Sequence, residues 1–530
     1  MRRIFSLFLI PFLVVLLLIS CNAANEYNEN ELNSGKNIDE EPIFIDEKNI
    51  HALNLEKKLS NWCVAFYKLR NNQAVWIKKS KPLTDNTKHF FNYVNNDTLL
   101  NIPFHYFESN LDLTNSTKEE KEIVTLLRIA SFLHLQHNPL FDLKKMNLHP
   151  SERVSPHVVL EFINSFAADR SWIEHLITYM APNANVIRFH FALNHFFAKH
   201  PVEQNVNAVK PEDLKDSIAV HKFIVQQLYH RNFISDTLLK HKETIEKLKE
   251  FQSYNGLNED GKLGKNTLSV LMSSNHARYI KGMITLDKLR RLPDSLIQSK
   301  FIAINIPSFL LRFYNKGERI STNRVILGTQ SNQTPIFSAT MKYIVVNPYW
   351  NVPYSIASQE ILPHLKKDST YLMRNHYTVL NRDKETVNPD SIDWNKYSVS
   401  TFPFFIRQEP GRLNSLGHVK IMFPNQHSIY IHDTPSRYLF NRDARTFSHG
   451  CIRTQDPFDL SKHILALEEH AYKDSLPALR KRDKETYLIL KDTFPVHVVY
   501  HTAGISDSTH QIRFYKDVYN LEAPLYSLFK

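Results

Sequence analysis

Residues 430–434 read Tyr430-Ile431-His432-Asp433-Thr434, and residues 448–453 read Ser448-His449-Gly450-Cys451-Ile452-Arg453. The alternation of apolar and polar residues in the first segment predicts a strand with Tyr430 and His432 on one face. In the second segment, Gly450 permits a tight turn. Asp456-Pro457, soon after it, combines a helix N-cap with a first-turn proline. The region therefore predicts a strand, a tight turn that carries a cysteine, and a helix.

Short β-branched runs recur throughout the last two fifths of the chain. They predict a β-rich domain over residues 300–530, and the clearest are Ile302 to Ile306, Tyr343 to Val346, Ser428 to Ile431 and Val496 to Tyr500. Between residues 355 and 402 the alternation gives way to a charged stretch of helix and loop character. We interpret this stretch as an insertion that caps a site.

Helical spacing of apolar residues dominates residues 51–239, for example at Ile123, Leu127 and Ala130. This spacing predicts an α-helical scaffold domain. Residues 240–275 predict two short helices joined by a glycine-containing turn, and residues 276–299 predict a connecting helix. The predicted fold class is therefore a multidomain α+β protein with a helical scaffold, a small helical domain and a C-terminal β-rich domain.

The small helical domain carries a specific pattern, in which Phe251-Gln252 is followed by Gly256-Leu257, Asp260-Gly261, Gly264 and Thr267. This pattern resembles the repeat of small peptidoglycan-binding domains. Residues 256–262 also read G-x-x-x-x-G-K, which begins a nucleotide phosphate loop. Leu263 stands where that loop needs a Ser or Thr to hold magnesium, and a helix rather than a strand comes before it. We therefore exclude nucleotide binding.

The whole chain has 530 residues, of which 42% are hydrophobic and 22% charged, with a formal net charge of +11. This length predicts three or four folded units, and the composition is that of a globular protein. The positive charge forms no dense run in the sequence. It therefore suits an anionic polymer or surface and does not indicate nucleic-acid binding.

The N-terminus predicts export. Arg2 and Arg3 precede an apolar run, Ile4 to Ile19, that is too short for a comfortable membrane span. The run ends at Leu18-Ile19-Ser20-Cys21, which resembles a bacterial lipobox. We therefore expect residues 1–21 to be a signal peptide and Cys21 to be lipidated, with an uncleaved signal anchor as the alternative. Both imply a periplasmic, membrane-anchored protein, and the polar residues 22–50 predict a flexible tether.

Cys451 and His432 are the residue types that thiol catalysis requires. A cysteine nucleophile needs a base to form its thiolate, and donors for the oxyanion that develops on the attacked carbonyl. His432 is the candidate base, and the turn at Gly450 aims backbone amides at one position. Arg453 and a protonated His432 are expected to lower the pKa of the Cys451 thiol.

A zinc site is an alternative use of the same residues. The histidines between His418 and Cys451 include His427 and His432, at a spacing that zinc sites permit. No second cysteine accompanies them, as it does in the usual zinc motifs. We therefore do not expect a zinc site here.

The two segments resemble the L,D-transpeptidases with a YkuD-type catalytic domain, whose signature is a histidine followed after some fifteen or more residues by S/T-H-G-C. Here fifteen residues separate His432 from Ser448-His449-Gly450-Cys451. Three further segments are similar to the large YcbB-type subgroup, namely Gln333 to Phe337, Asn347 to Pro353 and Arg407 to Gly411. The sequence departs from the signature at Arg453, where Asn is usual, and in its lipobox, where relatives have a transmembrane anchor.

The resemblance implies a reaction on peptidoglycan that needs neither a metal nor an organic cofactor. Cys451 would attack the third residue of a donor tetrapeptide stem, release the terminal D-Ala and form a thioester, while His432 would act as general base and acid. Backbone amides of His449, Gly450 and Cys451 would form the oxyanion hole, and a backbone carbonyl near Asp433 would orient His432. The side chain of His449 is expected to pack. The other residues implied in orienting or contacting the substrate are Tyr430, Arg453, Ser448 and Trp350.

The acceptor would be the amine of a neighbouring stem, which gives a 3→3 cross-link. The implied partners are therefore peptidoglycan stem peptides and glycan strands. Two alternatives remain open. One is an L,D-carboxypeptidase, in which water replaces the acceptor amine, and the other is a peptidoglycan-binding lipoprotein whose catalytic domain is degenerate.

Overall fold

The computed structural model describes the chain in segments. These are residues 42–55, 57–78, 88, 90–91, 94, 116–137, 154–166, 184–200, 214, 216–231, 233–255, 257–292, 299–368, 370–482, 484–506 and 511–529. The predicted signal peptide with Cys21, most of the predicted tether and Gly256 lie outside the described residues. No helix in the described segments is both long and apolar enough to cross a membrane.

The N-terminal unit is mainly helical, with a small sheet. Its helices are α2 (Glu47–Ala52), α3 (Lys57–Leu69), α5 (Lys118–His137) and α7 (Pro156–Phe166), and its strands β1 (Pro42–Phe44) and β2 (Gln73–Lys78) pair antiparallel. Ile123, Leu127 and Ala130 are buried, as their helical spacing predicts.

The end of the predicted tether is ordered, which corrects its assignment. Residues 42–50 contribute β1 and the start of α2, and Ile45 and Ile50 are buried in the core of the N-terminal unit. The polar composition that predicts a tether belongs to the residues before this stretch. The burial of Ile45 and Ile50 stabilises this ordered stretch by about 1.5–3 kcal/mol for each side chain.

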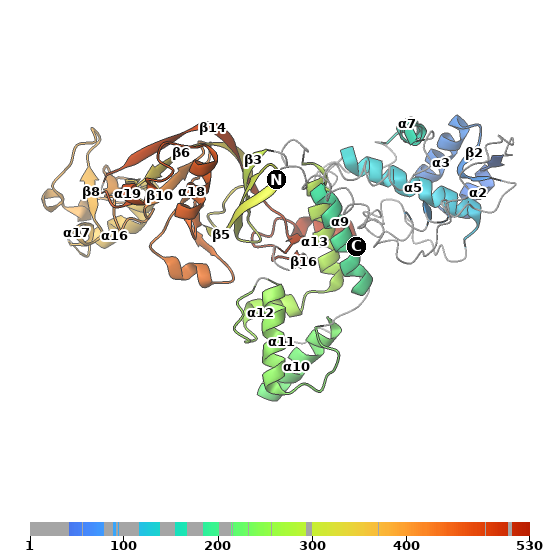
Figure 1. The fold of residues 1–530 in the computed structure, drawn as a ribbon, viewed down its shortest axis with the longest axis horizontal. Helices are drawn as coiled ribbons and strands as arrows, with labels where there is room; N and C mark the ends of the chain where they lie inside the picture. The colour runs from blue at the N-terminus through green and yellow to red at the C-terminus, as the bar shows by residue number, and fades with distance from the viewer. Residues whose placement is uncertain are drawn as a thin grey trace, which may run out of the picture.

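A second core joins segments that are far apart in the sequence. Helices α9 (Ala184–Lys199) and α13 (Asn275–Arg290) pack against the C-terminal hairpin of β15 (Ala503–Ile505) and β16 (Ile512–Phe514). Figure 1 shows these helices between the N-terminal unit and the β-rich unit. They therefore connect the two ends of the molecule.

The small helical unit consists of α10 (Ser217–His230), α11 (His241–Tyr254) and α12 (Lys265–Leu271). Gln252 holds its turn together: its side-chain amide donates to Asp260, to the Lys262 carbonyl and to Thr267, and its oxygen accepts from the Gly261 amide. Gly261 has a φ of +67°, where a side chain would be strained. The pattern that resembles peptidoglycan-binding repeats is thus the pattern that stabilises this turn.

The C-terminal unit is a nine-stranded sheet whose edges meet. Its order is β12-β5-β13-β11-β10-β6-β14-β3-β4, and a further β4–β5 pairing closes all strands except β12 into a barrel. The strands are β3 (Lys300–Asn305), β4 (Leu310–Asn315), β5 (Glu318–Gly328), β6 (Phe337–Val346), β10 (Val419–Met422), β11 (Ile431–His432), β12 (Thr446–Ser448), β13 (Ile452–Thr454) and β14 (Thr486–Val499). Closure removes exposed sheet edges, which stabilises a β-rich unit.

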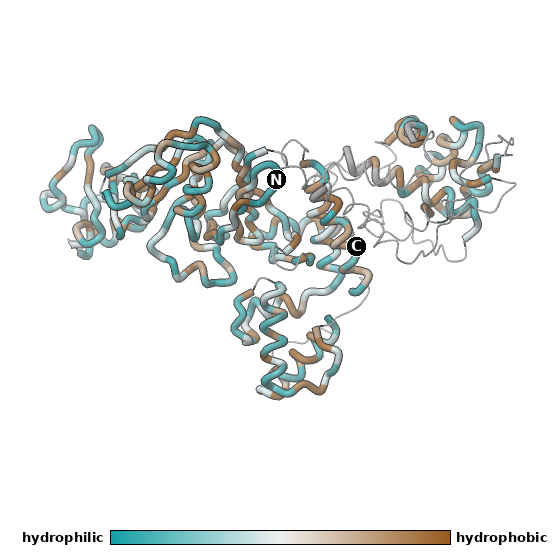
Figure 2. The backbone as a smooth tube through the Cα atoms, in the orientation of Figure 1, coloured by the Kyte–Doolittle hydropathy of each residue, from teal (hydrophilic) through white to brown (hydrophobic). Residues whose placement is uncertain are grey.

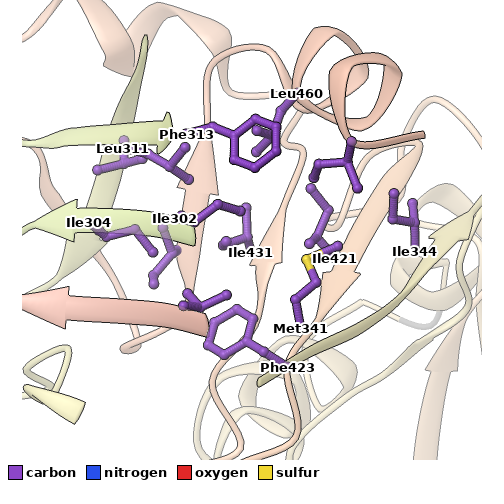
Figure 3. Close-up of a cluster of buried hydrophobic side chains, with 14 of the residues drawn as sticks. Ile302, Ile304, Leu311, Phe313, Met341, Ile344, Ile421, Phe423, Ile431 and Leu460 are labelled. Carbon is purple, nitrogen blue, oxygen red and sulfur yellow. The ribbon is translucent and has the colours of Figure 1, made fainter. Parts of the chain in front are cut away.

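The barrel has a dry apolar core. Figure 3 shows Ile302, Leu311, Met341 and Ile431, from four strands, in one cluster with Phe423, which follows β10, and Leu460, which a helix contributes. That helix, α18 (Pro457–Leu467), begins as predicted, because the Asp456 side chain accepts from the Asp459 amide. Along the strands, hydrophobic and hydrophilic residues alternate (Figure 2). The alternation places one side chain of each pair in this core and the next outside it.

The stretch between β6 and β10 forms a small subdomain with its own core. Its three-stranded sheet has the order β7-β9-β8, from β7 (Trp350–Asn351), β8 (Tyr377–Leu380) and β9 (Phe405–Gln408). The helical segments are α15 (Tyr354–Ile356), η6 (Ala357–Ile361), α16 (Leu362–Leu365), α17 (Tyr371–Arg374), η7 (Pro389–Ser391) and η8 (Trp394–Lys396). Val379, Trp394 and Ile406 are buried together here. The lapse in strand alternation over 355–402 thus marks an insertion that folds around a separate core.

Candidate active site

Four candidate residues share one face of two neighbouring strands. Strands β11 and β13 run parallel, with Ile431 opposite Ile452 and His432 opposite Arg453. Both isoleucines are fully buried in the barrel core. The residues before and after each isoleucine therefore point the other way, which puts Tyr430 and Cys451 on the face of His432 and Arg453. The Ile452 amide donates to the Tyr430 carbonyl at 3.0 Å, which holds the two segments side by side.

His432 is buried and held in one orientation. Its Nδ1–H donates to the backbone carbonyl of Asp433 at 2.6 Å, which is the orienting bond that the resemblance implies. That bond leaves Nε2 as the basic nitrogen of the neutral ring. Burial, and then the positive charge of Arg453, lower the pKa of His432 to about 3. The imidazole is therefore neutral at physiological pH, with Nε2 unprotonated.

The Asp433 carboxylate organises the loop rather than the imidazole. It accepts from the amides of His418 at 3.0 Å and Thr434 at 2.8 Å, and it pairs with Arg437 at 2.8 Å. Gly417 packs against it so closely that a Cβ there would lie 2.4 Å from the carboxylate. Gly417 also has a φ of +59°. The side chain of Asp433 thus positions the segment whose backbone holds His432.

Cys451 is a neutral thiol at rest. Burial raises its pKa, while hydrogen bonding with Tyr430 and the charges of Lys420 and Arg453 oppose that effect without reversing it. The expectation that a protonated His432 lowers this pKa is wrong, because His432 is neutral. The thiol donates to the Ser428 carbonyl at 3.9 Å, and within the described residues no hydrogen bond joins it to His432. Catalytic hydrogen bonds often tighten only when substrate binds.

The Ser448 side chain and Thr334 fix the loop before Cys451. The Ser448 hydroxyl donates to the Cys451 carbonyl at 2.6 Å and accepts from the Gly450 amide at 3.1 Å. The Thr334 hydroxyl donates to the Gly450 carbonyl at 2.8 Å. Gly450 has a φ of +114°, as the predicted tight turn requires. Because the Gly450 amide already donates to the Ser448 hydroxyl, the amides of His449 and Cys451 are the better candidates for an oxyanion hole.

Lys420 is a site residue that the sequence analysis missed. It lies opposite His432 on the antiparallel strand β10, so its side chain shares the site face. Its ammonium lies 4.0 Å from the centre of the Tyr430 ring, and its charge acts on the Cys451 thiol. The alternation in Val419-Lys420-Ile421 was the available signal, but only the strand order makes β10 a neighbour of β11.

Tyr430 and Trp350 form the aromatic border of the site. The rings of Tyr430 and His432 meet edge to face with centroids 5.5 Å apart. The Tyr430 hydroxyl lies beside the Cys451 thiol and the Trp350 indole, and burial raises its pKa. Trp350 sits on β7 and packs against the core of the inserted subdomain. An aromatic contact thus joins that subdomain to the nucleophile.

His449 does not pack in the interior, which corrects the expectation for its side chain. It is half exposed, and its Nε2 lies 2.7 Å from the carboxylate of Glu360 in η6. Glu360 belongs to the inserted subdomain, so this pair spans the gap between the insertion and the cysteine loop. The insertion therefore contacts the candidate site at two points, through Trp350 and through Glu360.

The histidines considered for zinc have other surroundings. His418 Nδ1 lies 3.0 Å from the Asn347 side chain, and the ring of His427 packs against Phe337. Among the described residues, no group of three or more His, Cys, Asp or Glu side chains is placed to hold a metal ion. The site instead combines a thiol, an imidazole, a phenol and two cations.

Comparisons with known proteins bear on two parts of the chain. Residues 299–496 match the YkuD family model, described as "L,D-transpeptidase catalytic domain", and residues 223–271 match a model described as "Putative peptidoglycan binding domain". The chain is 36% identical over 220 residues to a Haemophilus influenzae protein described as "Putative L,D-transpeptidase". That match covers 42% of this chain and 44% of the relative. The chain thus spans less than half the length of this relative.

Two solved L,D-transpeptidase structures also match. One, from Stackebrandtia nassauensis, is 14% identical with a TM-score of 0.21, over 56% of this chain and 95% of that chain. The other, from Xylanimonas cellulosilytica, is 12% identical with a TM-score of 0.17, over 56% of this chain and 98% of that chain. Similarity at this level supports no conclusion about this chain.

Proposed function

We propose that this chain forms 3→3 cross-links in peptidoglycan through a thioester on Cys451. The support is that residues 299–496 match the model of an L,D-transpeptidase catalytic domain and residues 223–271 match the model of a putative peptidoglycan-binding domain. One observation carries the proposal. A neutral, buried imidazole, with Nδ1 tied to the Asp433 carbonyl, shares a strand face with the only thiol of the described barrel residues. That combination suits proton abstraction from the thiol.

The first half-reaction acylates the enzyme. His432 Nε2 takes the proton from Cys451 as the sulfur attacks the carbonyl carbon of the third residue of a donor stem. The developing oxyanion is stabilised by the amides of His449 and Cys451. As the tetrahedral intermediate collapses, the peptide C–N bond breaks. The terminal D-Ala leaves with the proton that His432 returns, and a thioester remains.

The second half-reaction transfers the acyl group. The amine of an acceptor stem attacks the thioester carbonyl and loses a proton to His432, and the C–S bond breaks as Cys451 recovers a proton. The positive charges of Lys420 and Arg453 stabilise sulfur as it becomes anionic, and they offer contacts to stem carboxylates. If water replaces the amine, the same steps give an L,D-carboxypeptidase.

Product analysis tests the proposal. The full chain, in detergent, is incubated with a disaccharide-tetrapeptide, and protein and products are analysed by mass spectrometry beside Cys451→Ala. Cross-linked dimer with loss of D-Ala, absent from the variant, is the expected result. Tripeptide alone would assign carboxypeptidase activity. The absence of both thioester and product from the unaltered chain would instead leave a peptidoglycan-binding protein.

We also propose that the protein is an exported lipoprotein of the periplasm. The support is the charged and apolar N-terminal segment and its end at Cys21. Metabolic labelling with a fatty acid is expected to mark the unaltered chain and not Cys21→Ser. Equal labelling of the two would contradict lipidation at this position.

A further inference from the structure

A cavity of about 600 Å³ lies where the small helical unit meets the barrel. Its walls come from α12, α13, strands β4 and β5, the loop before β12, and the C-terminal segment around β16. None of its lining residues belongs to the group around Cys451. The volume falls in the range of about 300–1,000 Å³ that is typical of small-ligand sites.

The lining is strongly cationic. Eight of the described lining residues are Arg or Lys and two are acidic, which leaves an excess of six positive charges. Arg278 and Lys281 come from α13, and Arg324 from β5. This excess is more than half of the net charge of +11 that the whole chain carries. The cations thus converge here only in the folded protein.

Several of these cations have backbone carbonyls as their hydrogen-bond partners. Lys281 donates to the Tyr515 carbonyl at 2.8 Å, Arg324 to that of Phe440 at 3.4 Å, and Arg445 to three carbonyls. These carbonyls satisfy the N–H groups but carry no full charge. The carboxylate charges that act on Lys281 are those of Glu522 and Asp517, and the one that acts on Arg445 is that of Asp443. Burial, and then the nearby Arg324, lower the pKa of Arg445 to about 10, as expected where like charges face each other.

Contacts between the two units keep the cavity walls in place. The Asn258 amide and the Asn266 side chain both donate to the Asp443 carboxylate, and the Tyr254 hydroxyl donates to the Ile512 carbonyl at 2.8 Å. One of the two acidic lining residues is therefore committed to joining the units. Figure 1 shows β16 just above the small helical unit that contains α12.

We infer that this cavity is a second binding site for peptidoglycan, which holds a carboxylate-bearing stem peptide on its disaccharide away from Cys451. The chemistry of the lining selects an anion of small-ligand size, since six excess positive charges in a concave site attract and hold carboxylates. Part of its wall comes from residues that match the peptidoglycan-binding and L,D-transpeptidase models, and the rest comes from α13 and the C-terminal segment. The identity of the ligand rests on the proposed function, whereas the anion site rests on the lining alone.

Holding the polymer at two points has a thermodynamic advantage. Once one stem occupies the cavity, a neighbouring stem of the same strand reaches the catalytic face at a raised effective concentration. The cavity would thus favour polymeric peptidoglycan over isolated fragments.

Binding measurements on the full chain test the inference. In a Cys451→Ala background, which prevents turnover, the affinity for a disaccharide-tetrapeptide is compared between two triple variants. One removes exposed cavity charges through Arg324→Ala, Arg442→Ala and Lys516→Ala. The matched control removes three exposed charges elsewhere, through Lys316→Ala, Lys342→Ala and Lys462→Ala. We expect about tenfold weaker binding for the first and less than about twofold for the control.

A crosslinking measurement gives the location independently. p-Benzoylphenylalanine incorporated at position 269, which lines the cavity on α12, is expected to crosslink the fragment on irradiation. The same probe at exposed position 322 on β5, outside the lining, is not. This experiment decides the question if the charge-removing variant fails to fold.

Three outcomes would overturn the inference. They are equal affinity of the two triple variants, unchanged affinity for a fragment whose carboxylates are amidated, and no crosslink at position 269. Competition by inorganic polyphosphate as strong as that by the fragment, at equal ionic strength, would overturn the assignment to peptidoglycan. None of these depends on turnover. Failure of the cavity site therefore remains distinct from failure of the unaltered chain to form the Cys451 thioester.

Discussion

Replacement of Lys420 by methionine should make the Cys451 thiol less reactive. Lys420 lies opposite His432 with its ammonium over the Tyr430 ring, and its charge is one of those that lower the thiol pKa against the larger effect of burial. At an effective dielectric constant of about 20, a unit charge about 8–16 Å away contributes on the order of 1–2 kcal/mol. Each 1.4 kcal/mol corresponds to about tenfold in an equilibrium constant. The thiolate fraction at a given pH should therefore fall about tenfold.

The rate of alkylation by iodoacetamide measures that fraction directly, because the thiolate is the reacting species. Peptide mass mapping assigns the product to Cys451, and Cys63 is fully buried and raised in pKa by its burial. Across the pH range, the unaltered chain should react slowly at neutral pH and faster only under alkaline conditions. Lys420→Met should shift this rise to higher pH, while exposed Lys342→Met should leave it in place.

A low pKa of the Cys451 thiol would refute this prediction. If the unaltered chain reached its full alkylation rate below neutral pH, Cys451 and His432 would rest as a thiolate and an imidazolium. That result would refute both the dominance of burial at the thiol and the neutral state of His432. Equal profiles for Lys420→Met and Lys342→Met would refute the assignment of Lys420 to the site.

Three further measurements follow from the geometry. Gly417→Ala places a Cβ 2.4 Å from the Asp433 carboxylate at a φ of +59° and should lower the free energy of urea unfolding by about 1–3 kcal/mol. Gly264→Ala, with open space around it, should cost less, because it alters only the N-cap of α12. The pKa of His432 is about 3 in the folded chain and about 6.5 in the unfolded chain, so the unfolded state binds more protons between these pH values. The free energy of unfolding should therefore fall as the pH falls through this window. His432→Gln should lessen the slope of that free energy against pH. Glu360→Gln should change the free energy of unfolding by less than about 0.5 kcal/mol, because the Glu360–His449 pair is half exposed. Amide hydrogen exchange in η6 should nevertheless become faster. Unchanged exchange would show that this pair does not hold the insertion in place.

Local patterns predicted much of the site. The alternation through Tyr430 and His432, the tight turn at Gly450 and the helix start at Asp456 depend on residues within a few positions of one another, and the structure has all three. The Gln252 turn belongs to the same class, because its partners lie within fifteen positions. Short-range steric and hydrogen-bonding preferences act in almost any surroundings, so they can be recognised without knowledge of the fold.

Longer-range features required the tertiary structure. Lys420 joins the site only because β10 pairs with β11, and the cationic cavity gathers side chains from segments more than two hundred positions apart. Local sequence patterns did not predict the protonation states of Cys451 and His432. Burial has a larger effect on the pKa of each group than any single nearby charge, and it depends on the surrounding side chains. The sequence by itself thus determined which chemical groups the protein has and the local geometry of the thiol loop. The tertiary structure alone decided which groups are in contact, how deeply they are buried and what their protonation states are. The reason is that desolvation and the pairing of distant strands depend on the whole fold.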